Sequence, residues 1–154
     1  MKKFYDSVCK IETFLIKVFI VFLVSLVFIA AATRYMGYPI NWSVDIAVCL
    51  FAWCTFLGAD VAMRTNKLMN VEFFINRFSS KNKKYFELVN QLIILIFLLA
   101  LIGYGFKISY TTRFRTFQGI PWFSYTWVTI SVPIGSILMS ITTFLKIREK
   151  LIKG

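Results

Sequence analysis

The chain has 154 residues, of which 58% are hydrophobic, 18% aromatic and only 16% charged. A soluble globular domain carries about 25% charged residues, so this composition is not that of a soluble domain. The formal net charge of +11 does not indicate a nucleic-acid partner, because the cations are confined to a few segments. The chain has no histidine, the residue that most proton relays, metal sites and nucleophilic triads use. We therefore expect no enzyme, no catalytic residue, and no metal or other cofactor held by this chain.

Four apolar stretches, at residues 14–33, 43–63, 88–106 and 122–145, make up more than half of the chain. A bilayer core about 30 Å thick needs about 20 helical residues to cross it. Backbone polar groups in lipid must pair internally, and uninterrupted apolar runs favour helices over barrel strands. The sequence predicts an all-α integral membrane protein with four transmembrane helices and a single membrane domain over residues 1–154.

The segment before the first stretch is amphipathic. Phe4, Val8, Ile11 and Leu15 recur at helical spacing, with charged residues on the other side. This pattern predicts an interfacial helix that lies along the headgroups and leads into the first span. A cleaved signal peptide is the alternative for the first stretch, but its basic and apolar regions are long for a signal and favour a retained helix.

Two carboxylates lie within the second stretch. Asp45 is two residues inside its outer end, in reach of headgroup water, and Asp60 lies near its inner end. Arg64 follows Asp60 by four residues, the spacing of an ion pair on one helix face. An ionisable residue at membrane depth is a functional hypothesis by default. Here we favour structural roles for both carboxylates.

Small residues predict close helix packing. Gly58 belongs to a small-residue stripe on the second helix, and Gly135 to similar spacings on the fourth. At least one stripe is expected to pack within the chain, and others are interface candidates. The three cysteines have no CxxC spacing, and Cys49 and Cys54 point about 140° apart on one helix, so no disulfide is expected.

The middle loop repeats the amphipathic theme. Val71, Phe74, Ile75 and Phe78 lie at i, i+3, i+4 and i+7, which predicts a second interfacial helix. Two interpretations remain open. The helix either rests on membrane lipids or braces the orientation of the four-helix unit and its partner.

The distribution of cations predicts topology. Fourteen of the eighteen lie before the first helix, in the middle loop or in the tail, whereas Arg34, Lys107, Arg113 and Arg115 lie in the other two loops. The positive-inside rule then places both termini and the middle loop in the cytoplasm, an N-in, C-in arrangement. Trp42 flanks one external loop and Trp122 closes the other, as interfacial aromatic residues do.

Two segments carry a resemblance to a known family. The stretch from Arg34 through Trp42 and Asp45 to FAWCTFLGADVAMR, and the stretch GIPWFSYTWVTISVPIG at residues 119–135, resemble the small membrane subunit of tripartite ATP-independent periplasmic (TRAP) transporters, the DctQ-like family. Asp45 stands where a glutamate is common in that family, Val44 where a second acidic residue often occurs, and Leu68 where a histidine often follows the second helix.

The resemblance implies a small permease subunit in the bacterial inner membrane. Its partners would be a large TRAP membrane subunit in a heterodimer, a transiently bound periplasmic substrate-binding protein, and membrane lipids. The large subunit would carry the substrate and sodium sites, and this chain would be a scaffold in the uptake of an organic acid such as a C4-dicarboxylate or sialic acid. The external loop with Arg113 and Arg115 would receive the binding protein through charge complementarity, or would simply be solvated.

Two rival classes remain open at this point. One is a stand-alone, proton-coupled four-helix exporter acting as a homodimer, for which Asp45 and Asp60 would be the coupling carboxylates. Both lie near helix ends, which is unfavourable for that role. The other is a membrane enzyme, which the missing histidine and the cysteine spacing disfavour.

Overall fold

The computed structural model describes residues 2–65 and 80–152, and these residues are mainly helical. In chain order the elements are α1 (Lys2–Tyr35), α2 (Asn41–Arg64), α4 (Ser80–Thr111), the 3₁₀ helix η1 (Thr112–Phe114), α5 (Thr126–Thr129) and α6 (Ser131–Ile152). Four segments are long and apolar enough to cross a membrane: Cys9–Tyr35, Asn41–Arg64, Leu88–Phe114 and Thr126–Arg148. The prediction of four long apolar helices is therefore confirmed.

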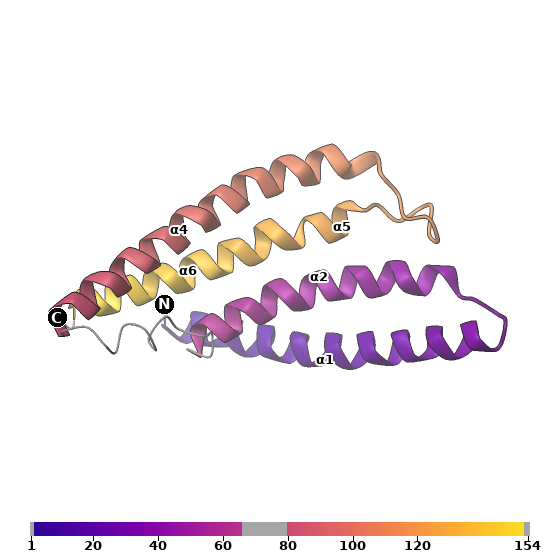
Figure 1. Ribbon diagram of the computed structural model, residues 1–154, viewed down its shortest axis with the longest axis horizontal. Coiled ribbons are helices and arrows are strands. Elements are labelled where there is room, and N and C mark those ends of the chain that lie inside the picture. Colours follow the sequence, from indigo (N-terminus) through magenta and orange to yellow (C-terminus); the bar gives the residue numbers. More distant parts are fainter. Residues whose placement is uncertain (1, 66–79, 153–154) are drawn as a thin grey trace.

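The long helices lie side by side in one layer, in the order α1, α2, α6, α4 (Figure 1). The extensive contacts join neighbours in this order: α1 with α2, α2 with α6, and α6 with α4. Helices α1 and α4 form the two edges of the layer, so the helices do not close into a four-helix bundle. None of the described helices lies across either face of this layer.

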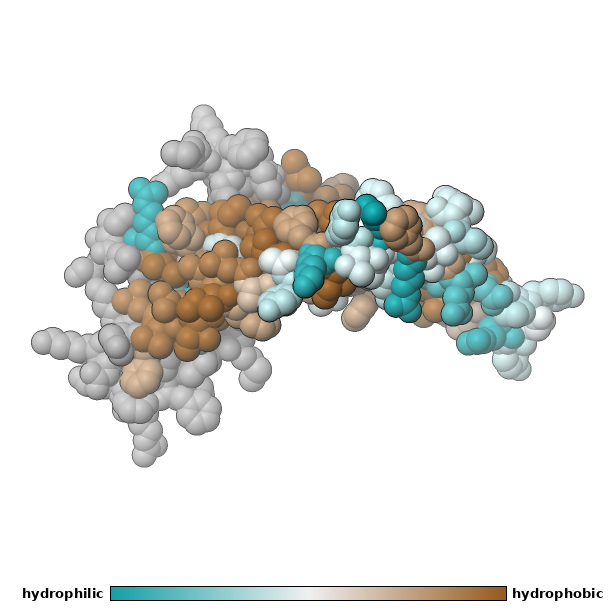
Figure 2. Space-filling view, turned by 90° about the horizontal axis from the view of Figure 1, so that it is seen from above, coloured by the Kyte–Doolittle hydropathy of each residue, from teal (hydrophilic) through white to brown (hydrophobic). Residues whose placement is uncertain are grey.

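Apolar side chains cover much of the exposed surface. On α1, Phe28 is 74% exposed, and Phe14 and Val21 are similarly open. The edge formed by α4 is apolar over much of its length and becomes hydrophilic toward the end that carries η1 (Figure 2). In lipid this exposure carries no penalty, because lipid tails are as apolar as the side chains themselves.

The chain ends lie together. The N- and C-termini are at the same end of the layer as the C-terminal end of α2 (Figure 1). The turn between α1 and α2 lies at the opposite end, where Gly37 adopts a φ of 85° and Tyr38 N donates to Thr33 O at 3.0 Å. This is the left-handed glycine that commonly ends a helix. The N-in, C-in membrane topology itself stays a prediction.

Helix bounds differ from the prediction at three places. Helix α1 is continuous from Lys2, so the N-terminal segment is helical but is not a separate element. Helix α4 continues to Thr111, which shortens the following loop. The last span begins at Thr126 rather than at residue 122, because residues 116–124 fold back as a short hairpin held by the bridge between Thr116 and Ser124.

Neither predicted interfacial helix is established. Ile11 of the N-terminal segment is exposed. The placement of this segment along the headgroups stays a prediction. The second predicted helix, with Val71, Phe74, Ile75 and Phe78, lies outside the described residues. Cys49 and Cys54, which share α2, are not joined to each other by a disulfide.

Candidate functional site

A buried polar cluster ties three helices together near the end that carries the termini. Arg64, the last residue of α2, donates from Nη2 to Glu12 of α1 and to Asp60 one turn earlier on α2. Thr142 of α6 donates its hydroxyl to the other oxygen of Asp60, at 2.7 Å. We call these four residues the polar clamp. The predicted pairing of Asp60 with Arg64 is present.

The clamp is almost closed to its surroundings. Asp60 is 1% exposed and Glu12 4%, whereas the Arg64 side chain is 20% exposed. Two carboxylates buried in an apolar environment are tolerated only when cations and hydrogen-bond donors compensate them. Arg64 supplies a planar group with several donors, which a lysine would not supply. The clamp therefore depends on this arginine.

A second set of contacts joins the end of α2 to α6. Lys146 donates to the carbonyl of Met63, one of the last carbonyls of α2, which lack partners within the helix. The Thr143 hydroxyl lies 3.2 Å from Met63 Sδ and 2.8 Å from Met139 O. A cation at the C-terminal end of a helix also interacts favourably with the helix dipole. Together with the clamp, these contacts fix this end of α2 against α6.

A second polar contact lies at the opposite end. The Asp45 carboxylate accepts a hydrogen bond from the backbone N–H of Gly119 at 2.7 Å, which ties the hairpin to α2. A Cβ at Gly119 would lie 2.8 Å from both Asp45 Oδ2 and Trp42 Cα, so the close approach requires glycine. Asp45 is therefore engaged by the chain itself.

Aromatic rings build the hairpin around this contact. Phe117 is buried and stacks on Phe123 with ring centroids 5.6 Å apart. Phe123 in turn stacks on Trp127 at 6.1 Å, and Trp53 of α2 donates its indole N–H to Trp127 O at 3.0 Å. Ring stacking thus packs the hairpin onto α5, and the Trp53 hydrogen bond joins α5 to α2, contacts that the sequence pattern did not indicate.

Arg113 and Arg115 are exposed beside the hairpin, and both lie over rings. The Arg113 guanidinium is 4.3 Å from the Tyr110 centroid and 4.5 Å from that of Phe114. The Arg115 guanidinium is 5.3 Å from the Tyr125 centroid. Cation–π contacts hold the arginines in place while leaving their charge at the surface.

The two predicted glycine contacts behave differently. A Cβ at Gly135 would lie 2.5 Å from Phe56 Cβ, so α6 approaches α2 as closely as a glycine allows. A Cβ at Gly58 would meet nothing within 4 Å. Gly135 therefore serves packing within the chain, whereas the Gly58 position is open.

The structure brings Asp60 together with Arg64 and brings Asp45 close to Trp42. It does not bring Asp45 and Asp60 together, since fifteen helical residues separate them by about 22 Å. Sequence reasoning missed Glu12. The sequence could have drawn attention to Glu12, because it is the sole acidic residue between positions 7 and 44. Across the described residues, no three Cys, Asp or Glu side chains gather as metal ligands would.

Comparisons with known proteins place the chain in a family. Residues 23–152 match the family described as tripartite ATP-independent periplasmic transporters, DctQ component. The chain is 24% identical over 101 residues to the sialic acid TRAP transporter small permease protein SiaQ of Vibrio cholerae, a match covering 66% of this chain and 58% of SiaQ. It is 26% identical over 101 residues to the sialic acid TRAP transporter permease protein SiaT of Haemophilus influenzae, covering 66% of this chain and 16% of SiaT. The match thus spans less than two thirds of either relative's length. With four helices able to cross a membrane, the chain is a multi-pass membrane protein that belongs to the DctQ family of TRAP transporter components.

Proposed function

We propose that this chain is the small permease subunit of a TRAP transporter and acts as the scaffold of a larger membrane subunit. The observation that carries the proposal is the single layer formed by the described helices, which is fastened near both ends and exposes many apolar side chains. Family membership gives the layer its context. A chain built this way offers a large apolar surface against which a second membrane protein can pack.

Fastening at both ends supports a stationary role. The clamp joins α1, α2 and α6 at one end, and the Asp45–Gly119 contact joins α2 to the hairpin at the other. Displacing α1 from α2 would separate Glu12 from Arg64 and leave a buried carboxylate without its cation, which costs about 3–5 kcal/mol. Such a layer resists internal rearrangement, so any transport motion falls to its partner.

The relatives support a large partner. The segment of SiaT that matches this chain makes up 16% of that protein, so in SiaT a comparable segment is continuous with a much longer polypeptide. We infer that this chain associates in the same way with a large membrane subunit that is a separate polypeptide. The open position at Gly58 offers a close-packing site for a helix of that subunit.

The substrate and coupling ion follow from the same proposal. SiaQ and SiaT are named for sialic acid, so an organic acid of this kind, or a C4-dicarboxylate, is the proposed substrate. The substrate and sodium sites would lie in the large subunit. The end with Arg113 and Arg115 would lie in the periplasm and would receive an acidic face of a substrate-binding protein, in a bacterial inner membrane with both chain termini in the cytoplasm.

The stand-alone exporter gains no support from the geometry. Its coupling carboxylate would need to release and bind protons as it faces alternate sides. Asp60 is instead bonded to Arg64 and Thr142, and Asp45 to Gly119 N. Replacing both aspartates with asparagine separates the two functions, because a scaffold with its interface intact would still support uptake.

Co-purification tests the proposal. The tagged chain is expressed with its neighbouring genes, purified in mild detergent, and analysed by light scattering and mass spectrometry. We expect one copy of a much larger membrane protein for each copy of this chain. Reconstituted together, the two chains and the binding protein should take up the organic acid only when a sodium gradient is present. A stable homodimer that carries no companion would overturn the proposal.

A further inference from the structure

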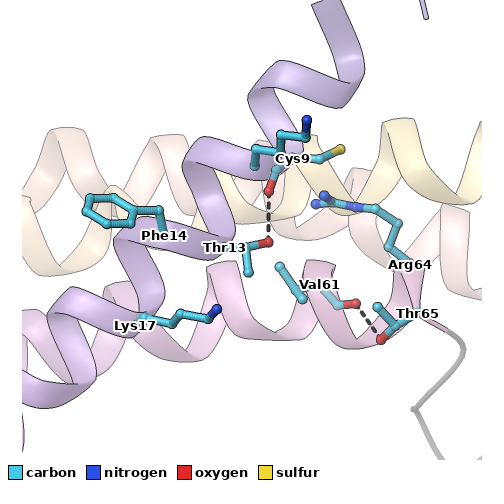
Figure 3. Close-up of a pocket in the computed structure, with 8 residues that line it drawn as sticks. Cys9, Thr13, Phe14, Lys17, Val61, Arg64 and Thr65 are labelled. Carbon is cyan, nitrogen blue, oxygen red and sulfur yellow. Dashed lines mark hydrogen bonds between the residues drawn. The ribbon is translucent and has the colours of Figure 1, made fainter. Parts of the chain in front are cut away.

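A pocket of about 340 Å³ opens between α1 and α2 at the end of the layer that carries the termini. Its wall combines the cations Lys10, Lys17 and Arg64 with apolar side chains that include Phe14. In Figure 3 the Lys17 side chain extends toward the α2 side of the pocket, and the Arg64 guanidinium reaches from α2 toward α1. Both cations therefore approach the space between the two helices.

The two lysines form a strip along α1. Lys10 and Lys17 are seven residues apart, so they share one helix face and lie about 10.5 Å apart along the axis. The span begins at Cys9, which places Lys17 about 12 Å inside it. A lysine at that depth directs its ammonium group back toward the headgroups. The strip thus runs from the interface into the apolar layer.

The strip keeps an excess of positive charge. Arg64 is compensated by Glu12 and Asp60. Lys10 and Lys17 are exposed, and the side chains that the structure describes place no carboxylate within ion-pair distance of either. Asp6, one turn before Lys10, lies outside the described side chains. Even if Asp6 paired with Lys10, Lys17 would leave the pocket positive.

We propose that this pocket binds the phosphate group of an anionic phospholipid, whose acyl chains lie in the groove between α1 and α2. The lysines and the exposed edge of Arg64 would receive the phosphate oxygens. Phe14, which is 66% exposed, would pack against the first part of an acyl chain. A soluble anion would gain nothing from Phe14 or from a cation so deep in the span, and this favours a lipid. The inference depends only on the chain spanning a membrane, and not on its role in a transporter.

The opposite end of the same groove provides a matched control. A pocket of similar volume, about 330 Å³, lies there between α1 and α2, and its cation is Arg34. The two pockets share the same pair of helices and similar size but differ in charge. A preference for an anionic headgroup should therefore depend on the lysines and not on Arg34.

Native mass spectrometry of the purified full-length chain, with any subunit that co-purifies, tests the inference. Phosphatidylglycerol and phosphatidylcholine are titrated separately, and the apparent affinity of each is measured. Because each interfacial cation contributes about 1 kcal/mol toward an anionic lipid, the variant K10Q/K17Q should bind phosphatidylglycerol about 10- to 30-fold more weakly. K10R/K17R should bind as the wild type does, and R34Q should be unchanged.

Three results would overturn the inference. The first is unchanged phosphatidylglycerol affinity in K10Q/K17Q when tryptophan fluorescence shows that the variant is folded. The second is equal affinity of the wild type for both lipids. The third is full displacement of the lipid by excess inorganic phosphate, which would identify a soluble-anion site. Co-purification of the large subunit with K10Q/K17Q is measured in parallel, so failure of the lipid site and failure of the transporter assignment can be told apart.

Discussion

Replacing Arg64 with methionine tests whether buried charge holds the layer together. In the wild type one guanidinium serves both Glu12 and Asp60, which are 4% and 1% exposed. The substitution keeps a long apolar side chain but leaves two buried carboxylates without a cation. Removal of one partner from a buried ion pair costs about 3–5 kcal/mol. We therefore expect the unfolding equilibrium constant to rise by about two to three and a half orders of magnitude.

The charge-neutral variant E12Q/D60N/R64M separates charge from packing. It contains no uncompensated charge, and the two amides can hydrogen-bond each other because the side chains of residues 12 and 60 both meet Arg64 Nη2 in the wild type. A buried ion pair replaced by well-packed hydrophobic residues of similar volume is often no less stable, and a buried amide costs little when it is hydrogen-bonded. This triple variant should therefore recover most of the stability that R64M loses.

Unfolding in mixed micelles of mild detergent and dodecyl sulfate, followed by tryptophan fluorescence, measures these free energies. R34M is the control, since Arg34 is exposed at the opposite end of α1, and its effect should be about 0.5 kcal/mol or less. A loss below about 1 kcal/mol for R64M would mean that the clamp behaves as an exposed salt bridge. If the triple variant is as unstable as R64M, the loss comes from the packing of the arginine stem, and the charge argument fails.

Three further predictions concern single contacts. Gly135→Ala should destabilise the chain by about 1–3 kcal/mol, because the added Cβ would overlap the side chain that it faces on α2. Gly58→Ala should leave the stability unchanged, because its Cβ would meet nothing. The same micelle titration compares the two variants, and equal effects would contradict the distinction. Asp45→Ala should reduce the free energy that holds the hairpin against α2 by about 1.5–3 kcal/mol. The Gly119 amide should then exchange its hydrogen faster, and unchanged exchange would show that the contact is not stabilising. Thr142→Val removes one hydrogen-bond donor from the buried aspartate of the clamp, so the free energy of unfolding in the titration should fall by about 1–3 kcal/mol. An unchanged free energy would show that water replaces the hydroxyl.

The spans and the Asp60–Arg64 pair could be predicted because both depend on local sequence. Hydropathy over about 20 residues identifies a membrane helix, and a four-residue spacing places two charges on one helix face. Glu12 could not be assigned its partner in this way. It meets Arg64 across 52 positions of sequence, and only the packing of α1 against α2 brings the two together.

The hairpin was missed for a related reason. Residues 122–125 are apolar and aromatic and extend the hydropathy of the last span, so they were predicted to be helical. In the structure the stacking of Phe117 on Phe123 and the Asp45–Gly119 contact turn this segment back before the helix begins at Thr126. Hydropathy does not distinguish an aromatic residue that faces lipid from one that stacks in a loop.

Small-residue spacing identified Gly58 and Gly135 equally, and the structure separates them. Gly135 lies against Phe56, and Gly58 faces open space. The spacing reports that a helix face permits close approach, and it carries no information about whether the partner helix belongs to the same chain. The assignment of each glycine required the order of helices in the layer.

This order explains why polar contacts lie at the helix ends. A flat layer of four helices could not persist in water, where its uncovered apolar faces would collapse against one another. In lipid that driving force is absent, and association depends on close packing and on hydrogen bonds. The chain uses close packing along α6, at Gly135, and polar contacts near the ends of α2, at Asp60 and Asp45. Between these ends the exposed surface of the helices is largely apolar, so lipid or a partner subunit can cover it.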